Sequence, residues 1–325
     1  MQTMKKLCGL MLCMCMITAA LTGCSQSKRM MFGTGGTAGT YYSYGGVIAQ
    51  YMKNYADVKA VAVSTGGSKV NIQSIEDGDF QLGFTQSDVM TYGWEGTRAF
   101  EKDGGTQAFR VLASLYAETV QIITLDKSIE TVSDLKGKRV SIGQAGSGVY
   151  FNAIDVLEAA DIGLEDIKPQ YQSFEDSKEA LKDGRIDAAF IVAGPPTTAI
   201  TELATTNGVK LIGLDNELQA KIIEKCPYYK AYAIPAGTYP GQDDEIRTVT
   251  VEATLIVSAD ADEKTVYDLT AAIFDHIEDI TKENAKGQEL DLNTATDIMT
   301  VPYHKGAAKY YEEKGYTVNT EAEAK

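Results

Sequence analysis

The stretch Met31–Tyr44, MFGTGGTAGTYYSY, carries the strongest structural signal in this sequence. Four glycines lie within seven of its residues: Gly33, Gly35, Gly36 and Gly39. They separate a short apolar segment from a helix that we expect to begin near Ser43. Unpaired N–H groups at a helix N-terminus, together with the helix dipole, favour an anion or a carboxylate. The stretch therefore predicts an anion-binding loop.

Three further glycine turns follow predicted strands. Ser64–Ser68 (STGGS) follows the strand Val58–Val63, and Gly143–Gly148 (GQAGSG) follows a strand that begins at Val140. Val192–Thr197 (VAGPPT) ends a third strand. Because ligands bind at the carboxyl ends of parallel strands, the four turns predict a cleft walled by backbone donors and hydroxyl groups. About half of the turns are expected to be no more than tight turns or helix caps.

Strands and helices alternate along the chain, which predicts an α/β fold with a parallel sheet covered on both faces. Ile75–Phe84 and Leu181–Phe190 resemble each other, so we expect two similar lobes. Residues 31–123 with 251–325 would form lobe 1, and residues 124–250 lobe 2. Arg110–Leu125 is long enough for two strands or for one strand that crosses between lobes. Further predictions are an ordered loop at Tyr228–Arg247 and helices at Ser43–Tyr55, Lys69–Glu76, Val149–Ala160, Ser177–Asp183, Glu263–Lys286 and Tyr303–Lys314.

The first 24 residues have the features of an export signal. Lys5 and Lys6 precede the apolar run Leu7–Ala20, which is too short to span a membrane. The ending Leu21–Cys24 (LTGC) resembles a bacterial lipobox, which implies cleavage before Cys24 and a lipid on its sulfur. Residues 1–23 would be the signal peptide and 24–30 a tether, so the protein is expected to be extracytoplasmic and lipid-anchored to the bacterial cell membrane. An uncleaved anchor or an ordinary signal peptide is the alternative.

The charge of the exported form argues against several partners. Without Lys5 and Lys6, 28 basic and 45 acidic residues remain, a net charge of −17. Nucleic acid and anionic membrane surfaces are poor partners for such a chain, so the lipid is the only expected membrane contact. Cys226 is the only cysteine after Cys24 and is expected to be a buried apolar residue rather than a nucleophile.

A dinucleotide site is the main enzymatic alternative. Gly33–Ala38 satisfies G-x-G-x-x-A, but the pattern also needs an acid about 20 residues later, at the end of the second strand. Asp57 precedes that strand, whereas Ser64 and Thr65 follow it. The sequence therefore disfavours a nucleotide cofactor.

Other catalytic patterns are absent from the sequence: it contains no G-x-x-x-x-G-K-[ST], H-E-x-x-H or G-x-S-x-G. Its two histidines, His276 inside the predicted long helix and His304, are expected to be surface or capping residues. Asp88 and Glu118 have no readable acidic partner. We predict no catalytic residue, no metal and no cofactor.

Six ordered motifs resemble the TAXI family, the solute receptors of tripartite ATP-independent periplasmic (TRAP) transporters. They are GTGG-x-x-GTYY at Gly33–Tyr42, STGGS at Ser64–Ser68, F-x-Q-S-D at Phe84–Asp88, GSG at Gly146–Gly148 with Asn152, IPAGTYPGQ at Ile234–Gln242 and VPYHKGAAKYYEEKG at Val301–Gly315. The resemblance implies a two-lobe type II periplasmic binding protein fold with the ligand in the interlobe cleft. It also implies a TRAP-type membrane permease as partner.

The ligand implied by the resemblance is a small carboxylate: an amino acid such as glutamate, a dicarboxylate or a 2-oxoacid. Either Tyr41 or Tyr42 is expected to reach it. Expected ligand contacts are Gly35, Gly36, Thr37, Tyr41, Tyr42, Ser64, Thr65, Gln86, Gly146, Ser147, Gly148, Asn152 and Gly194. A lipoprotein that presents the solute to a membrane signalling partner is the alternative function.

Overall fold

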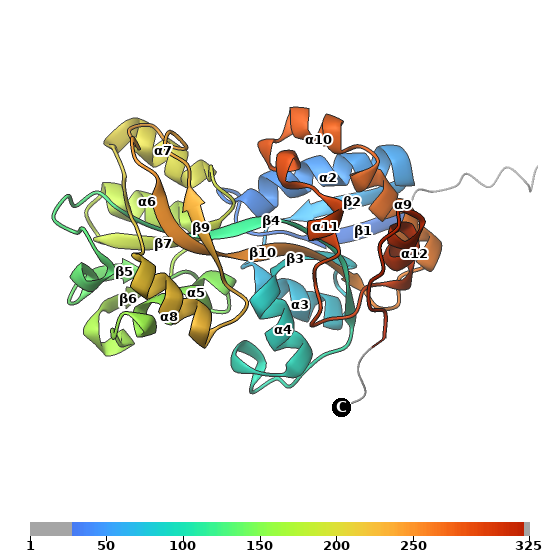
Figure 1. Cartoon of the computed structure of the whole chain (residues 1–325), viewed down its shortest axis with the longest axis horizontal. Helices are drawn as coiled ribbons and strands as arrows, with labels where there is room; N and C mark the ends of the chain where they lie inside the picture. The colour runs from blue at the N-terminus through green and yellow to red at the C-terminus, as the bar shows by residue number, and fades with distance from the viewer. Residues whose placement is uncertain (1–27, 322–325) are drawn as a thin grey trace, which may run out of the picture.

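The computed structural model describes residues 28–321, which form one mixed ten-stranded sheet with helices on both faces (Figure 1). The strand order is β2-β1-β3-β10-β4-β7-β5-β6, with β8 paired to β4 and β9 to β10. The strands are β1 Lys28–Gly33, β2 Val58–Val63, β3 Leu82–Gln86, β4 Phe109–Thr124, β5 Arg139–Ser141, β6 Lys168–Gln170, β7 Ala188–Ala193, β8 Lys210–Ile212, β9 Lys230–Ile234 and β10 Ile246–Ser258. The predicted signal peptide and Cys24 lie outside the described residues.

Helices join these strands in both lobes. They are α2 Thr40–Ala56, α3 Ser68–Glu76, α4 Ser87–Glu95, α5 Gly148–Ala159, α6 Phe174–Lys182, α7 Thr198–Asn207, α8 Asn216–Lys225, α9 Glu263–Phe274, α10 Ile277–Glu283, α11 Leu292–Ala295 and α12 Lys305–Glu313. Short 3-10 turns include η1 (Arg98–Phe100) and η4 (Ala285–Glu289). Within the described part of the chain, no helix is long and apolar enough to cross a membrane.

Two long antiparallel strands, β4 and β10, run from one lobe to the other (Figure 1). β4 is therefore one crossing strand, which decides between the two alternatives for Arg110–Leu125. Val111 to Tyr116 pack in the core of the first lobe, whereas Val120 and Ile122 pack in the second. The predicted lobe bounds stay a prediction, and these cores favour a crossing near Thr119.

Strand β7 shows how the second lobe buries both faces of its sheet. Alternate residues of a strand point to opposite faces. Ala188, Phe190 and Val192 pack with α5 and α8, whereas Ala189 and Ile191 pack with α6 and α7. Because both faces are covered, the strand is a continuous apolar run rather than an alternating one.

The prediction of one helix over Glu263–Lys286 was wrong, because α9 ends at Phe274 and a separate helix, α10, begins at Ile277. The Asp275 carboxylate accepts hydrogen bonds from the Tyr310 hydroxyl (2.9 Å) and the Lys314 ammonium (2.8 Å), and both donors come from the end of α12. His276 leaves helical geometry at φ −126° and ψ 24°, and its ring stacks on Tyr55. His276 therefore lies at the start of α10 and not inside a helix.

Other boundaries also differ from the prediction. α2 begins at Thr40, because Gly39 is extended and its N–H closes a turn onto the Gly36 carbonyl (3.0 Å). The segment Tyr228–Arg247 contains β9, which pairs with β10, so it is not simply a loop. Helices α4, α7, α8 and α11 were not predicted.

Candidate functional site: the interlobe cavity

A cavity of about 70 Å³ lies between the two lobes. Its floor is formed by Glu118 of β4 with Val192 and Ala193 of β7, at the point where β4 crosses between lobes. One wall comes from the first lobe and consists of Gly35, Gly36, Gly39, Thr40, Tyr41, Gly66, Gly67, Ser68 and Gln86. The opposite wall consists of Gly143, Gln144, Ser147, Gly148, Val149, Gln172, Ser173 and Phe174.

Helices from both lobes point their N-termini at this cavity. The first residues of α2, α3, α5 and α6 line it. Helices α2, α3 and α5 have no acidic residue in the first turn, whereas α6 has Glu175 and Asp176 there, and its N-cap Ser173 accepts a bond from the Asp176 N–H. The N-caps of α2 and α3 are Gly39 and Gly67, which offer no side-chain bond to the first amides. Gly67 has φ +99°, a conformation that favours glycine. Unpaired amide donors therefore face the cavity.

No Lys, Arg or His is among the described residues that line the cavity. The nearby Lys69 ammonium is engaged elsewhere, with the Ala99 carbonyl and the Asp103 carboxylate, both at 2.6 Å. Backbone dipoles are therefore the source of positive potential in this space. We expect them to attract an anion despite the negative charge of the chain.

The predicted ligand residues fall into three groups. Those that line the cavity are Gly35, Gly36, Tyr41, Gln86, Ser147 and Gly148. Those that line an adjoining hollow, which shares Gly36 and Gly66 with the cavity, are Thr37, Ser64 and Thr65. Those that line neither space are Tyr42, Gly146, Asn152 and Gly194. Ligand contact stays a prediction for all of them.

Two of the residues that line neither space, Gly194 and Asn152, have a structural role. The Thr40 hydroxyl donates to the Gly194 carbonyl over 2.8 Å, which joins the lobes, and a side chain at Gly194 would press on Tyr116. Asn152 is fully buried in a polar network between the lobes. Tyr42 is 37% exposed, so of the two tyrosines only Tyr41 borders the cavity.

Glu118 lines the cavity but was not among the predicted ligand residues. Its side chain is buried, and Oε1 has no hydrogen-bond partner among the described residues. Burial raises the pKa of Glu118 to about 8, although Tyr116 and Lys286 act to lower it. The sequence did contain a signal for this role, because Glu118 is an acidic residue in the middle of Arg110–Leu125, a segment that could form one strand crossing between the lobes. Ser68, Gln172 and Phe174 were also missed.

Several polar atoms that line the cavity have no hydrogen-bond partner in the described part of the chain. Besides Glu118 Oε1, they are the Tyr41 hydroxyl, Gln86 Oε1 and Gln172 Oε1. Buried polar groups in folded proteins are nearly always hydrogen-bonded. Four such atoms around one cavity therefore indicate a space built for a polar ligand.

The lobes are in close contact around the cavity. The Gln86 side chain of the first lobe lies against Gly148 of the second, where a side chain would overlap it. Arg98 of η1 pairs with Asp155 of α5 at 2.6 Å. These contacts describe a closed arrangement.

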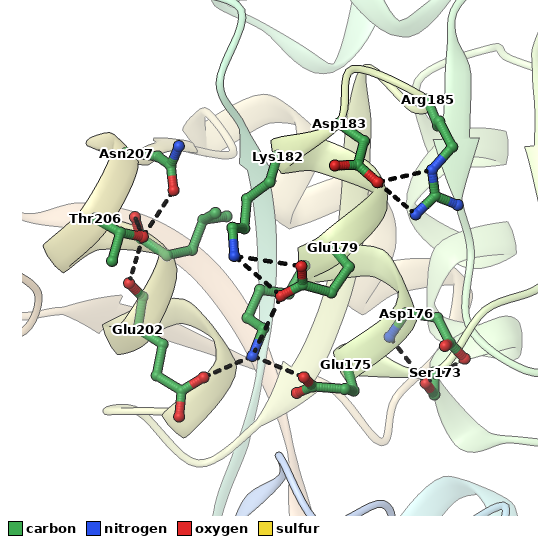
Figure 2. Close-up of polar contacts among 12 residues, drawn as sticks. Ser173, Glu175, Asp176, Glu179, Lys182, Asp183, Arg185, Glu202, Thr206 and Asn207 are labelled. Atoms are coloured by element: carbon green, nitrogen blue, oxygen red, sulfur yellow. Dashed lines mark hydrogen bonds and ion pairs between the residues drawn. The ribbon is translucent and has the colours of Figure 1, made fainter.

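Helix α6, which carries Ser173 and Phe174 to the cavity, is fixed by polar contacts on its outer side (Figure 2). Ser173 caps the helix by accepting from the Asp176 N–H at 3.1 Å. Lys178 pairs with Glu175 at 2.8 Å and with Glu202 of α7 at 2.6 Å. The second wall of the cavity is therefore anchored to its own lobe.

A family model matches residues 32–315, which is most of the chain, and its description is the NMT1-like family. The chain belongs to the NMT1-like family.

Solved structures resemble this NMT1-like protein at low sequence identity. The alkanesulfonate-binding protein SsuA from Xanthomonas axonopodis pv. citri, bound to MOPS, is 15% identical, with 89% of this chain and 92% of that one covered and a TM-score of 0.50. A protein of Bordetella bronchiseptica RB50 is 16% identical, with 89% and 83% covered and a TM-score of 0.50. These likenesses show the fold, which is the type II periplasmic binding protein fold with its cleft between the lobes.

Proposed function

We propose that this NMT1-like protein is an extracytoplasmic receptor that binds a small carboxylate between its lobes and delivers it to a TRAP-type membrane permease. The observation that carries the proposal is the convergence of α2, α3 and α5 on one cavity. Each helix begins there without an acidic residue, and α2 and α3 begin without a side-chain cap. A carboxylate would supply the missing acceptor.

The size of the cavity fits such a ligand. A water molecule needs roughly 10–15 Å³ of space measured in this way. About 70 Å³ therefore accommodates several atoms beyond one carboxylate group, but not a nucleotide or a peptide. Tyr41, Gln86 and Ser147 would add polar contacts, and Gly35, Gly36 and Gly148 would allow close backbone approach.

Closure gives the bonds to the ligand their strength. Hydrogen bonds from amides to a carboxylate are stronger where water is excluded. The contact between Gln86 and Gly148 closes the cavity on one side. In this scheme the protein binds its ligand without a chemical step.

The permease partner and the lipid anchor rest on the sequence motifs. The ordered motifs from Gly33 to Gly315 resemble the TAXI receptors of TRAP transporters, and Leu21–Cys24 resembles a lipobox. A lipid at Cys24 would hold the receptor close to a permease in the same membrane.

A thermal-shift screen tests the binding step. Ligand at 100 times its Kd adds about 2.7 kcal/mol to the free energy of unfolding, which corresponds to a rise of several degrees in Tm. We expect this rise with an amino acid, dicarboxylate or 2-oxoacid, but not with a neutral sugar or a nucleoside. Absence of any rise with millimolar acids would contradict the proposal. Uptake by vesicles that hold a TRAP-type permease, dependent on added receptor, tests the delivery step.

A further inference from the structure

Glu118 occupies a distinctive place at the floor of the cavity. It lies where β4 crosses between the lobes, opposite Val251 of β10. Tyr116 lies on the same face of the strand two residues earlier. The carboxyl group therefore faces the ligand space from below, whereas the helix N-termini face it from the sides.

Each charged group near Glu118 is accounted for. Lys286 of η4 is the nearby cation, but its ammonium pairs with Glu289 and lies 5.6 Å from the centre of the Tyr116 ring. Glu289 opposes ionisation of Glu118, and the Gly194 N–H favours it. Tyr41 and Tyr116 face it from α2 and β4 as neutral phenols, since burial raises the pKa of both well above 10. Residues 28–321 therefore provide no free cation for this carboxyl.

One oxygen of this buried carboxyl, Oε1, has no hydrogen-bond partner among the described residues. Leaving it unpaired is costly, and a bound ligand could supply the missing donor. Gln86 Oε1 and Gln172 Oε1 are unpartnered acceptors in the same cavity. Three unpartnered acceptors in one cavity favour a ligand that carries several donors. An ammonium group has three N–H donors and a positive charge, whereas a second carboxylate has neither.

We propose that Glu118 is a specificity residue that binds the ammonium group of the ligand, so that the ligand is an amino acid and not a dicarboxylate or a 2-oxoacid. This inference rests on the proposed function, because it presupposes a carboxylate at the helix N-termini. This pairing also implies that ligand binding releases a proton. Since the pKa of free Glu118 is about 8, roughly nine-tenths of these groups are protonated at pH 7 and must ionise to pair with an ammonium.

Titration calorimetry at pH 7 with matched acids tests the inference. Each set shares one carbon skeleton: glutamate, 2-oxoglutarate and glutarate in the first, and leucine, 4-methyl-2-oxopentanoate and 4-methylpentanoate in the second. Titrations in phosphate and in Tris, whose ionisation enthalpies differ, count the protons released. The variants are Glu118→Gln and Glu118→Asp, and Glu252→Gln on the neighbouring strand β10 is the control, since it does not line the cavity.

We expect one amino acid to bind 10- to 100-fold more tightly than its two analogues, with release of close to one proton per site. Glu118→Gln should remove most of that preference and the proton release, Glu118→Asp should retain the release, and Glu252→Gln should behave as wild type. If an analogue binds as tightly as the amino acid, or without the predicted proton release, the role of Glu118 is wrong and the proposed function stands. If no acid in either set binds, both are overturned. The number of protons that the wild-type protein releases on binding tests the role of Glu118 even if a variant does not fold.

Discussion

Asn152 of α5 donates a hydrogen bond from Nδ2 to Oδ2 of Asp88 on α4, over 3.0 Å and between the two lobes. The same Nδ2 donates to the Tyr229 hydroxyl at 2.7 Å, and this hydroxyl donates to Asp155 Oδ2 at 3.0 Å. Arg98 completes the network through its 2.6 Å bond to Asp155 Oδ1. None of these residues lines the cavity. The closed arrangement is therefore held in part by contacts that do not involve ligand.

Removal of Arg98 should destabilise the protein. The Asp155 side chain is only 1% exposed, so Arg98→Ala would leave a buried carboxylate without its cation. Breaking a buried pair in this way costs about 3 kcal/mol, and urea unfolding measures the loss. Arg247→Ala is the control, because Arg247 is exposed and its side chain donates to the Asn216 side chain, with no carboxylate paired to it among the described residues. A loss below about 1 kcal/mol for Arg98→Ala would show that the pair contributes little to the closed state.

Asp88 should make the stability of the ligand-free protein depend on pH. Burial raises the pKa of Asp88 from 3.8 to about 7. Between these values the folded state binds more protons than the unfolded state, so the free energy of unfolding falls as pH rises. The contribution is complete below about pH 4 and is lost as pH passes through 7; it amounts to at most about 4 kcal/mol.

Asp88→Asn removes this titration and keeps an acceptor for Asn152. Urea unfolding of both proteins at pH 5, 6, 7 and 8 measures their free energies of unfolding. The value for the variant should increase relative to that of wild type as pH rises. Comparison of the two proteins cancels the contribution of Glu118, which acts in the same direction. A difference that stays constant with pH would contradict the raised pKa.

Gly148→Ala should prevent full closure. The added methyl group would overlap the Gln86 carboxamide of the opposite lobe, whereas Gly148 lies in the first turn of α5, where alanine is well tolerated. We expect at least a tenfold loss of ligand affinity and a larger radius of gyration by small-angle scattering. Gly46→Ala in α2 is the matched control, since its methyl group meets nothing within 4 Å. Equal affinity in the two variants would rule out Gln86–Gly148 closure.

Tyr41→Phe should separate ligand binding from stability. The hydroxyls of Tyr41 and Tyr44 are both buried and unpartnered, but only Tyr41 lines the cavity. Loss of either hydroxyl should leave the free energy of unfolding nearly unchanged, because no protein hydrogen bond is broken. Tyr41→Phe should weaken ligand binding about tenfold, and Tyr44→Phe should not. If the two variants bind alike, the Tyr41 hydroxyl does not contact the ligand.

Local patterns predicted the elements that depend on local chemistry. Val58–Val63 has the predicted bounds, and α3 begins one residue before the predicted start at Lys69. The apolar run and the glycine turn specify such elements through neighbouring residues alone. His304 is a capping residue, as predicted: its Nδ1 accepts from the Gly306 N–H at 3.1 Å. Cys226 is buried, also as predicted.

Contacts between distant segments could not be predicted in the same way. The break at Asp275 depends on donors from α12, which lies some 35 residues later in the sequence. The position of Glu118 at the cavity depends on how far β4 extends in each lobe. Asn152 was predicted to contact the ligand, because the sequence does not show that folding places Asp88 and Tyr229 beside it. These outcomes follow from tertiary packing, which overrides local preference.

Mass spectrometry of the small molecule that co-purifies with the full chain tests the central claim most directly. The account predicts a small organic acid with at least one carboxyl group, close to one molecule per chain, largely lost from Gly148→Ala and retained by Gly46→Ala. A retained molecule without a carboxyl group, or equal retention by both variants, would contradict a carboxylate held between the lobes.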